Sequence, residues 1–240
     1  MLSGSDISRY NISWDGKNWI SYGDWLGAPR EQKFFTNPRI LIRQIVSGTP
    51  PRIYASYTNE EYYNTQIAFN ILVKDKGLIH EKVLLPILNS KLMNFYHTEK
   101  FLDKSKRLFQ KILILNAKLF PIKIPQNQTP IITLCDYMLF LNGLGERRKN
   151  ERELTKFIDK QVIDSLVYEL YFKAKFEEEG LETNLMGLVE VYLKDIENLE
   201  VDAEKLKVIK EVVEGIKRDR EVKREIEKIK GHEWVKVIEG

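Results

Sequence analysis

Two arginines interrupt an otherwise apolar segment, and their residue type suggests what they could bind. The segment RILIRQI begins at Arg39 and is rich in β-branched residues, which predicts a strand. Alternate side chains of a strand point to opposite faces. Arg39, Leu41 and Arg43 then share one face, and Ile40 and Ile42 share the other. Fixed positive charge on a strand this apolar requires a partner, because burying an unpaired guanidinium costs several kcal/mol.

Further basic residues lie close by in the sequence, at Arg30, Lys33 and Arg52. Guanidinium groups recognise phosphates and base edges through paired hydrogen bonds. Aromatic residues that could stack on bases alternate with the basic ones: Trp25, Phe34, Phe35, Tyr54, Tyr57, Tyr62 and Tyr63. Two interpretations remain open. One is a surface that binds nucleic acid, which the residue types favour. The other is a sheet edge whose arginines pair with the nearby acids Asp24, Glu31, Glu60 and Glu61.

Residues for catalysis are not evident. Asp24, Glu31 and Lys33 resemble the two acids and lysine of a metal-dependent nuclease, but such short patterns arise often by chance. The three histidines have no neighbours that would make them a general base, and there is no glycine-rich phosphate loop. The single cysteine, Cys135, excludes a disulfide framework. We therefore expect no catalytic residues and no metal site in this chain.

The sequence pattern of the first half of the chain predicts a small sheet with helices. Asp15-Gly16 predicts a hairpin turn between a strand ending at Trp14 and another starting near Trp19. Proline and glycine at 47–51 predict a turn. The remaining elements expected are strands at 39–46, 52–57, 66–73 and 111–124 and a helix at 81–97.

After a linker at 126–129, the sequence becomes helical. Helices are expected at 131–142, 154–171, 184–197 and 203–230. In the last of these, Leu206, Ile209, Val213 and Ile216 form a narrow heptad-like seam. The seam could close on the helix at 184–197, or the pair could serve as a docking site for a separate catalytic domain or for a second copy of the chain. The predicted fold class is α+β, with a mixed β-sheet domain at 1–125 followed by an all-α helical extension at 126–240.

Composition bounds the class of protein. Hydrophobic residues make up 43% and charged residues 30%, which is typical of a folded globular chain. Residues 1–130 hold 18 Lys and Arg against 10 Asp and Glu, whereas residues 131–240 hold 20 against 25. The basic half favours a phosphate-bearing partner. No apolar run is long enough for a signal peptide core or a membrane span, so a cytoplasmic protein without a membrane partner is expected.

Five blocks carry a resemblance to a known family. They are SGSDISRY (3–10), WISYGDWLGAPREQKFFTNPRILIRQI (19–45), YYNTQIAFNILVK (62–74), LLPILNSKLMNFYH (84–97) and FQKILILNAKLFPIKIP (109–125). In order and spacing they resemble the TaqI-like C-terminal specificity domain, the target recognition domain of adenine-specific DNA methyltransferases and fused restriction-modification enzymes. The stretches at 130–144 and 163–172 resemble the helical tail that follows this domain.

The resemblance implies that this chain reads a sequence in double-stranded DNA for a methyltransferase domain or subunit. That partner would bind S-adenosylmethionine and methylate adenine, so no cofactor is expected in this chain. The Asn-Pro-Pro-aromatic motif that orients the flipped adenine is absent, because Arg39 follows Asn37-Pro38. The DNA-binding residues expected from charge and from the resemblance are Arg30, Lys33, Arg39, Arg43, Arg52, Asn64 and Asn89.

Two alternatives stay open at this point. The chain could be a stand-alone specificity subunit whose helices dock separate catalytic subunits. It could instead be a protein-interaction module whose basic half binds an acidic partner.

Overall fold

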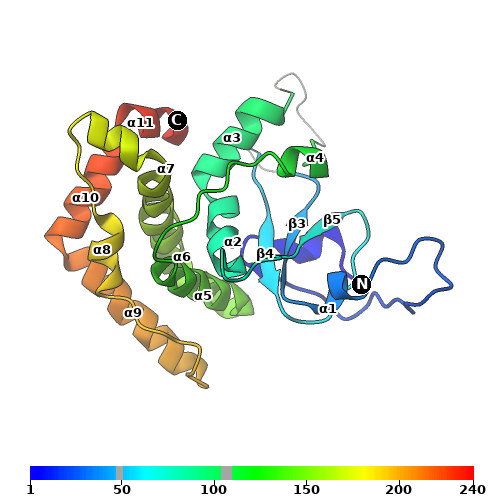
Figure 1. Cartoon of the computed structure of the whole chain (residues 1–240). Coiled ribbons are helices and arrows are strands. Elements are labelled where there is room, and N and C mark those ends of the chain that lie inside the picture. The colour runs from blue at the N-terminus through cyan, green and yellow to red at the C-terminus, as the bar shows by residue number, and fades with distance from the viewer. Residues whose placement is uncertain (47–50, 104–109) are drawn as a thin grey trace.

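A computed structural model describes residues 1–46, 51–103 and 110–240 of the chain (Figure 1). A small α+β part is followed by packed helices, as predicted. Its sheet has three antiparallel strands in the order β4-β3-β5. They are β3 (Arg39–Arg43), β4 (Ala55–Thr58) and β5 (Ala68–Ile71). All three predicted strands in this region are confirmed, although each is shorter than expected.

The alternation of side chains on β3 is confirmed. Ile40 and Ile42 are fully buried in the main hydrophobic cluster, which also contains the buried residues of the helices. Leu41 lies in a second, small cluster on the opposite face, with Leu2 and Ile7. The arginine-bearing face of the strand is therefore covered by the N-terminal segment.

The first hairpin forms earlier in the chain than the sequence predicted. A short 3-10 helix, η1 (Gly4–Asp6), leads into β1 (Ile7–Ser8), which pairs with β2 (Asn11–Ile12) across the turn Arg9-Tyr10. The hairpin around Asp15-Gly16 was a wrong prediction. The loop there is held by side chains instead, since the rings of Trp14 and Trp19 lie edge to face at 4.8 Å and the indole of Trp19 donates to the carbonyl of Gly16.

The predicted helix at 81–97 is divided in two at Ser90. This residue ends α2 (Glu81–Asn89), and its hydroxyl accepts a hydrogen bond from the N–H of Met93 at 3.1 Å, which caps α3 (Lys91–Phe101). The predicted strand at 111–124 is wrong. That segment has one isolated bridge between Ile45 and Lys111, the short helix α4 (Ile114–Ala117) and then extended chain without strand pairing. The turn predicted at 47–51 lies mostly outside the described residues.

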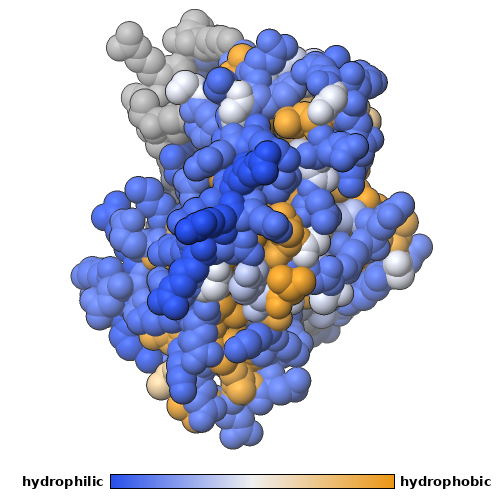
Figure 2. Space-filling view, turned by 90° about the vertical axis from the view of Figure 1, so that its left-hand side faces the viewer, coloured by the Kyte–Doolittle hydropathy of each residue, from blue (hydrophilic) through white to orange (hydrophobic). Residues whose placement is uncertain are grey.

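Helices form the rest of the molecule. Their bounds are α1 (Lys33–Thr36) in the first part, then α5 (Thr129–Gly143), the 3-10 helix η2 (Gly145–Glu151), α6 (Arg152–Phe157), the π-helical segment η3 (Ile158–Ile163), α7 (Asp164–Glu178), α8 (Leu185–Glu190), α9 (Asp202–Arg218), α10 (Arg220–Gly231) and α11 (Glu233–Glu239). The helix predicted at 203–230 breaks at Asp219, which caps α10. The outer face of α8–α11 is largely hydrophilic, with a narrow hydrophobic strip (Figure 2). No helix in the described ranges is long and apolar enough to cross a membrane.

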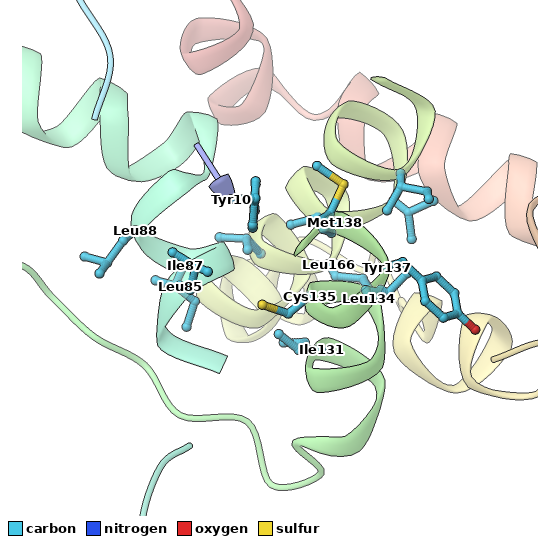
Figure 3. Packing of buried hydrophobic residues seen from close by; sticks show 14 of the residues in the cluster. Tyr10, Leu85, Ile87, Leu88, Ile131, Leu134, Cys135, Tyr137, Met138 and Leu166 are labelled. Atoms are coloured by element: carbon cyan, nitrogen blue, oxygen red, sulfur yellow. The ribbon is translucent and has the colours of Figure 1, made fainter. Parts of the chain in front are cut away.

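A single hydrophobic cluster extends from the sheet into the C-terminal helices. Leu85 and Ile87 of α2 face Ile131 and Cys135 of α5 (Figure 3). The same cluster continues to Val213 of α9. The division of the chain at 125 and 126 remains a prediction, and the two parts share this core.

The seam of α9 is buried within the chain, and a charge placed there tests this packing. Val213 is 1% exposed, whereas Val191 is 78% exposed. Val213→Glu should lower the free energy of unfolding by about 3 kcal/mol or more, because it buries an unpaired carboxylate. Val191→Glu should change it by less than about 0.5 kcal/mol. Chemical denaturation measures both, and gel filtration should show the same oligomeric state as wild type. Unchanged stability with lost assembly would mean that the seam is a docking site.

A second stability prediction concerns pH. His97 is buried against Phe101 and Phe120, and burial lowers its pKa to about 4 from an ordinary 6.5. The unfolded chain therefore binds the extra proton first, and stability falls as pH decreases from about 6.5 toward 4. Between pH 7 and 4.5, wild type should lose about 2–3 kcal/mol more than His97→Leu. Parallel stability curves for the two proteins would show that His97 is not held neutral.

Candidate nucleic-acid interface

Arg39 lies in the interior, where its guanidinium binds backbone rather than a carboxylate. It is 0% exposed, and its nitrogens donate to the carbonyls of Asn37 at 2.9 Å, Glu60 at 3.1 Å and Tyr62 at 3.0 Å. Burial lowers the pKa of Arg39 to about 10, and the negative charge of Glu61 offsets part of this shift by raising the pKa. The side chain therefore ties the 58–62 connection to the start of β3. This burial removes Arg39 from the surface that DNA could reach, and it fits neither interpretation of the sequence, since its partners are not carboxylates.

Asn89 is also interior. It is 0% exposed, its side-chain amide donates to the carbonyl of Ala55 at 3.0 Å, and its oxygen accepts from the N–H of Ala55 at 3.2 Å. Both bonds join the end of α2 to the edge strand β4. The side chain of Asn89 therefore has a structural partner on the sheet.

The other predicted residues are at least partly exposed but do not form one group. Lys33 is exposed and pairs with Glu31 at 2.6 Å. Arg43 is partly exposed, with its guanidinium 5.3 Å from the ring centre of Tyr54. Arg52 lines one groove, and Arg30 and Asn64 line another.

Arg30 and Asn64 are brought together in a groove of about 640 Å³ beside the edge strand β5. We call it the aromatic groove and define it by six of its lining residues: Tyr22, Arg30, Phe34, Asn64, Gln66 and Asn70. Gln66 and Asn70 were not predicted from the sequence. Both lie within the strand predicted at 66–73, which was the available signal, since β5 is an edge strand.

Ring packing fixes the wall of the aromatic groove that carries Arg30. Tyr22 packs against Phe35 at 5.3 Å and Tyr63 at 4.7 Å between ring centres. The hydroxyl of Tyr22 donates to the carbonyl of Arg30 at 2.6 Å and accepts from its N–H. The backbone of the exposed arginine is thus anchored by a packed ring, while its side chain has no ion pair among the described residues.

Two amide oxygens at the aromatic groove have no hydrogen-bond partner in the described part of the chain. They are Oδ1 of Asn64 and Oδ1 of Asn70. The Nδ2 of Asn64 is already used, donating to the carbonyls of Thr65 and Ala68 at 3.1 and 2.9 Å. Buried acceptors without partners are costly.

The groove therefore combines an unpaired arginine, amide groups and flat rings, which are the groups that recognise base edges and stack on bases. Among the described residues, no group of three or more His, Cys, Asp or Glu is placed to hold a metal ion.

Residues 1–122, which contain the whole groove, match the family model of the TaqI-like C-terminal specificity domain. The chain belongs to this family. The specificity domain thus includes the sheet, α2, α3 and both walls of the aromatic groove.

A longer protein shows a related sequence beyond the specificity domain. The chain is 27% identical over 192 residues to a protein of Methanocaldococcus jannaschii named "Putative type II restriction enzyme and methyltransferase". The match covers 78% of this chain and 16% of that protein. The similarity therefore extends into the helices after the specificity domain, and this chain spans about a sixth of the relative's length.

The contrast between Arg39 and Arg30 can be measured directly. Arg39→Ala leaves three carbonyls without their donor and should lower the free energy of unfolding by about 3 kcal/mol or more. Arg30→Ala removes an exposed side chain and should change it by less than about 0.5 kcal/mol. Chemical denaturation of both variants measures the two changes in the free energy of unfolding. Equal effects would show that the guanidinium of Arg39 does not hold the 58–62 connection.

Proposed function

We propose that this chain recognises a specific sequence in duplex DNA on behalf of an adenine-specific methyltransferase or a fused restriction-modification enzyme. Membership of the specificity-domain family over residues 1–122 is the observation that carries the proposal. The relative's name, which joins a restriction enzyme to a methyltransferase, supports the same class of system.

The aromatic groove is the part of the domain best suited to reading bases. Arg30 can donate two hydrogen bonds to the O6 and N7 of guanine, and the amides of Gln66 and Asn70 can pair with adenine. Lys33 is exposed and Arg43 is partly exposed on the same half of the chain, and both would contribute charge toward phosphates. Arg39 and Asn89 hold the sheet and α2 in place and act on DNA binding only through the fold.

The methyl transfer would belong to a partner. We propose that a methyltransferase domain or subunit binds S-adenosylmethionine and methylates adenine, while this chain supplies the sequence-reading wall of the DNA cleft. The catalytic residues and the cofactor site would both be on that partner.

Selection from a pool of randomised duplexes tests the proposal. Wild type should enrich one sequence and bind it more tightly than a scrambled duplex of equal composition. Arg30→Ala should reduce this preference about tenfold or more, because a good contact between arginine and a base is worth about 1–3 kcal/mol. Arg220→Ala, on α10 and also exposed, is the matched control and should leave the preference unchanged.

Salt dependence provides an independent check. Each phosphate contact contributes about −0.9 to the slope of log affinity against log salt concentration. Enrichment of no sequence, together with a slope near zero, would contradict DNA recognition and favour the protein-interaction alternative.

A further inference from the structure

A second groove lies where Arg9 and Arg52 of the specificity domain meet η2, α6 and η3 of the helical part. Its volume is about 820 Å³. We call it the basic groove and define it by Arg9, Arg52, Arg148, Arg152, Lys156 and Lys160. Seven of its ten lining residues are Lys or Arg, and one, Asp159, is acidic.

The positive charge of the basic groove is mostly uncompensated. Arg52, Arg148, Arg152 and Lys156 are exposed, and none has a carboxylate within 4 Å among the described residues. A cluster of like charges without acidic partners destabilises the free protein through mutual repulsion. Such an arrangement is relieved by a bound polyanion.

The floor of the groove is rigid. Arg9 donates to Asp159 at 2.7 Å and to the carbonyl of Asn89 at 2.9 Å, and Lys160 pairs with the same Asp159 at 3.1 Å. Arg9 belongs to the tight turn in which Tyr10 has a φ of 58°, an unusual value for a residue other than glycine. Asp159 and Lys160 belong to the π-helical segment η3, a conformation found frequently at functional sites. Two uncommon backbone conformations thus meet at this groove.

The cations form a row rather than a single cluster. Arg148, Arg152 and Lys156 follow one another at intervals of four residues through η2 and α6. Four helical residues rise roughly 6–8 Å, so the charges are distributed along one wall of the groove. Arg52, which precedes β4, faces them from the specificity domain. A row of this kind matches a linear polyanion better than an isolated phosphate ion.

We infer that the basic groove binds the sugar-phosphate backbone of duplex DNA outside the bases that the aromatic groove reads. This inference rests on the proposed function, because the same DNA molecule would occupy both grooves. The specificity domain would supply sequence preference, and the helices after it would supply affinity that does not depend on sequence. Arginine and lysine in this role change the salt dependence of binding without changing which sequence is preferred.

The test compares two triple variants. The groove variant is Arg148→Ala/Arg152→Ala/Lys156→Ala. The control, Arg220→Ala/Lys223→Ala/Arg224→Ala on α10, removes the same residue types, exposed and without an ion pair in the described structure. The single variant Arg52→Ala probes the opposite wall and stays informative if the triple variant is unstable. Thermal unfolding checks each protein first.

The probes are the duplex enriched by selection, a scrambled duplex of equal length, and a single-stranded RNA of equal length, each titrated at several salt concentrations. The groove variant should bind both duplexes at least tenfold more weakly than the control, by the same factor for each. Its salt slope should be shallower by about 2–3, since three phosphate contacts are lost. Arg52→Ala should reduce the slope by about 1.

Three outcomes would overturn the inference. If wild type prefers the selected duplex but the groove and control variants bind it alike, the proposed function stands and the groove has no part in it. If the groove variant loses RNA binding alone, the ligand class is wrong. If wild type binds no duplex at all, the proposed function fails and the inference fails with it.

Discussion

The burial of α2 on two sides is the constraint on which the rest of the structure depends. Every residue of this helix except Lys82 is buried. One side packs on β3 and β4, and the other packs on α5 (Figure 3). A helix that is buried on nearly all sides must lie inside a larger body. The sheet is therefore covered on this face only because the C-terminal helices are present, and removing those helices would expose a large apolar surface. The same sandwich brings Arg52 opposite Arg148 and Arg152, because the two walls of the basic groove are joined through α2.

Arginine has two opposite functions in this fold, and the difference is one of environment. Arg39 is enclosed by the N-terminal segment and by the 58–62 connection, and three carbonyl groups replace the water that its charge has lost. Arg30 is nine residues earlier and exposed, with its backbone anchored by the hydroxyl of Tyr22. Charge on a strand therefore identifies a binding surface only when the segment that covers the strand is known.

Local patterns predicted the elements whose cause is local. The alternation of β3 followed from isoleucines at 40 and 42, and α5 and the long helix through α6 and α7 followed from apolar spacing. The misplaced hairpin had a strong local signal in Asp15-Gly16, but the packing of two tryptophans held that loop instead. The apolar run at 111–124 has the composition of a strand. A strand also needs a neighbouring strand with free N–H and C=O groups, and composition does not show whether such a neighbour is present.

The candidate sites could be predicted only in part, because they too combine residues that are distant in the sequence. Arg30 and Asn64 followed from charge and from family resemblance, whereas Asn70 required the position of an edge strand. The cations at 148, 152 and 156 were hidden because residues 131–240 are acidic on average. A mean charge over a hundred residues says little about one face of one helix. Their spacing of four was visible in the sequence, but the arginines at 9 and 52 that complete the groove are close only in the folded chain.

The π-helical segment η3 has a geometric consequence for the arrangement of these surfaces. A π turn holds one residue more than the α turn it replaces, so every side chain after it is rotated by about 100° relative to an uninterrupted helix. Before the segment, the row at 148–156 faces the groove. After it, Leu166 and Val167 face the core. One additional residue thus sets the angle between the charged face of α6 and the buried face of α7, which belong to one continuous helix. Loss of that residue would leave the helix intact but would turn the cations away from Arg52. The register of the helix, rather than its composition, therefore determines whether the groove has two walls.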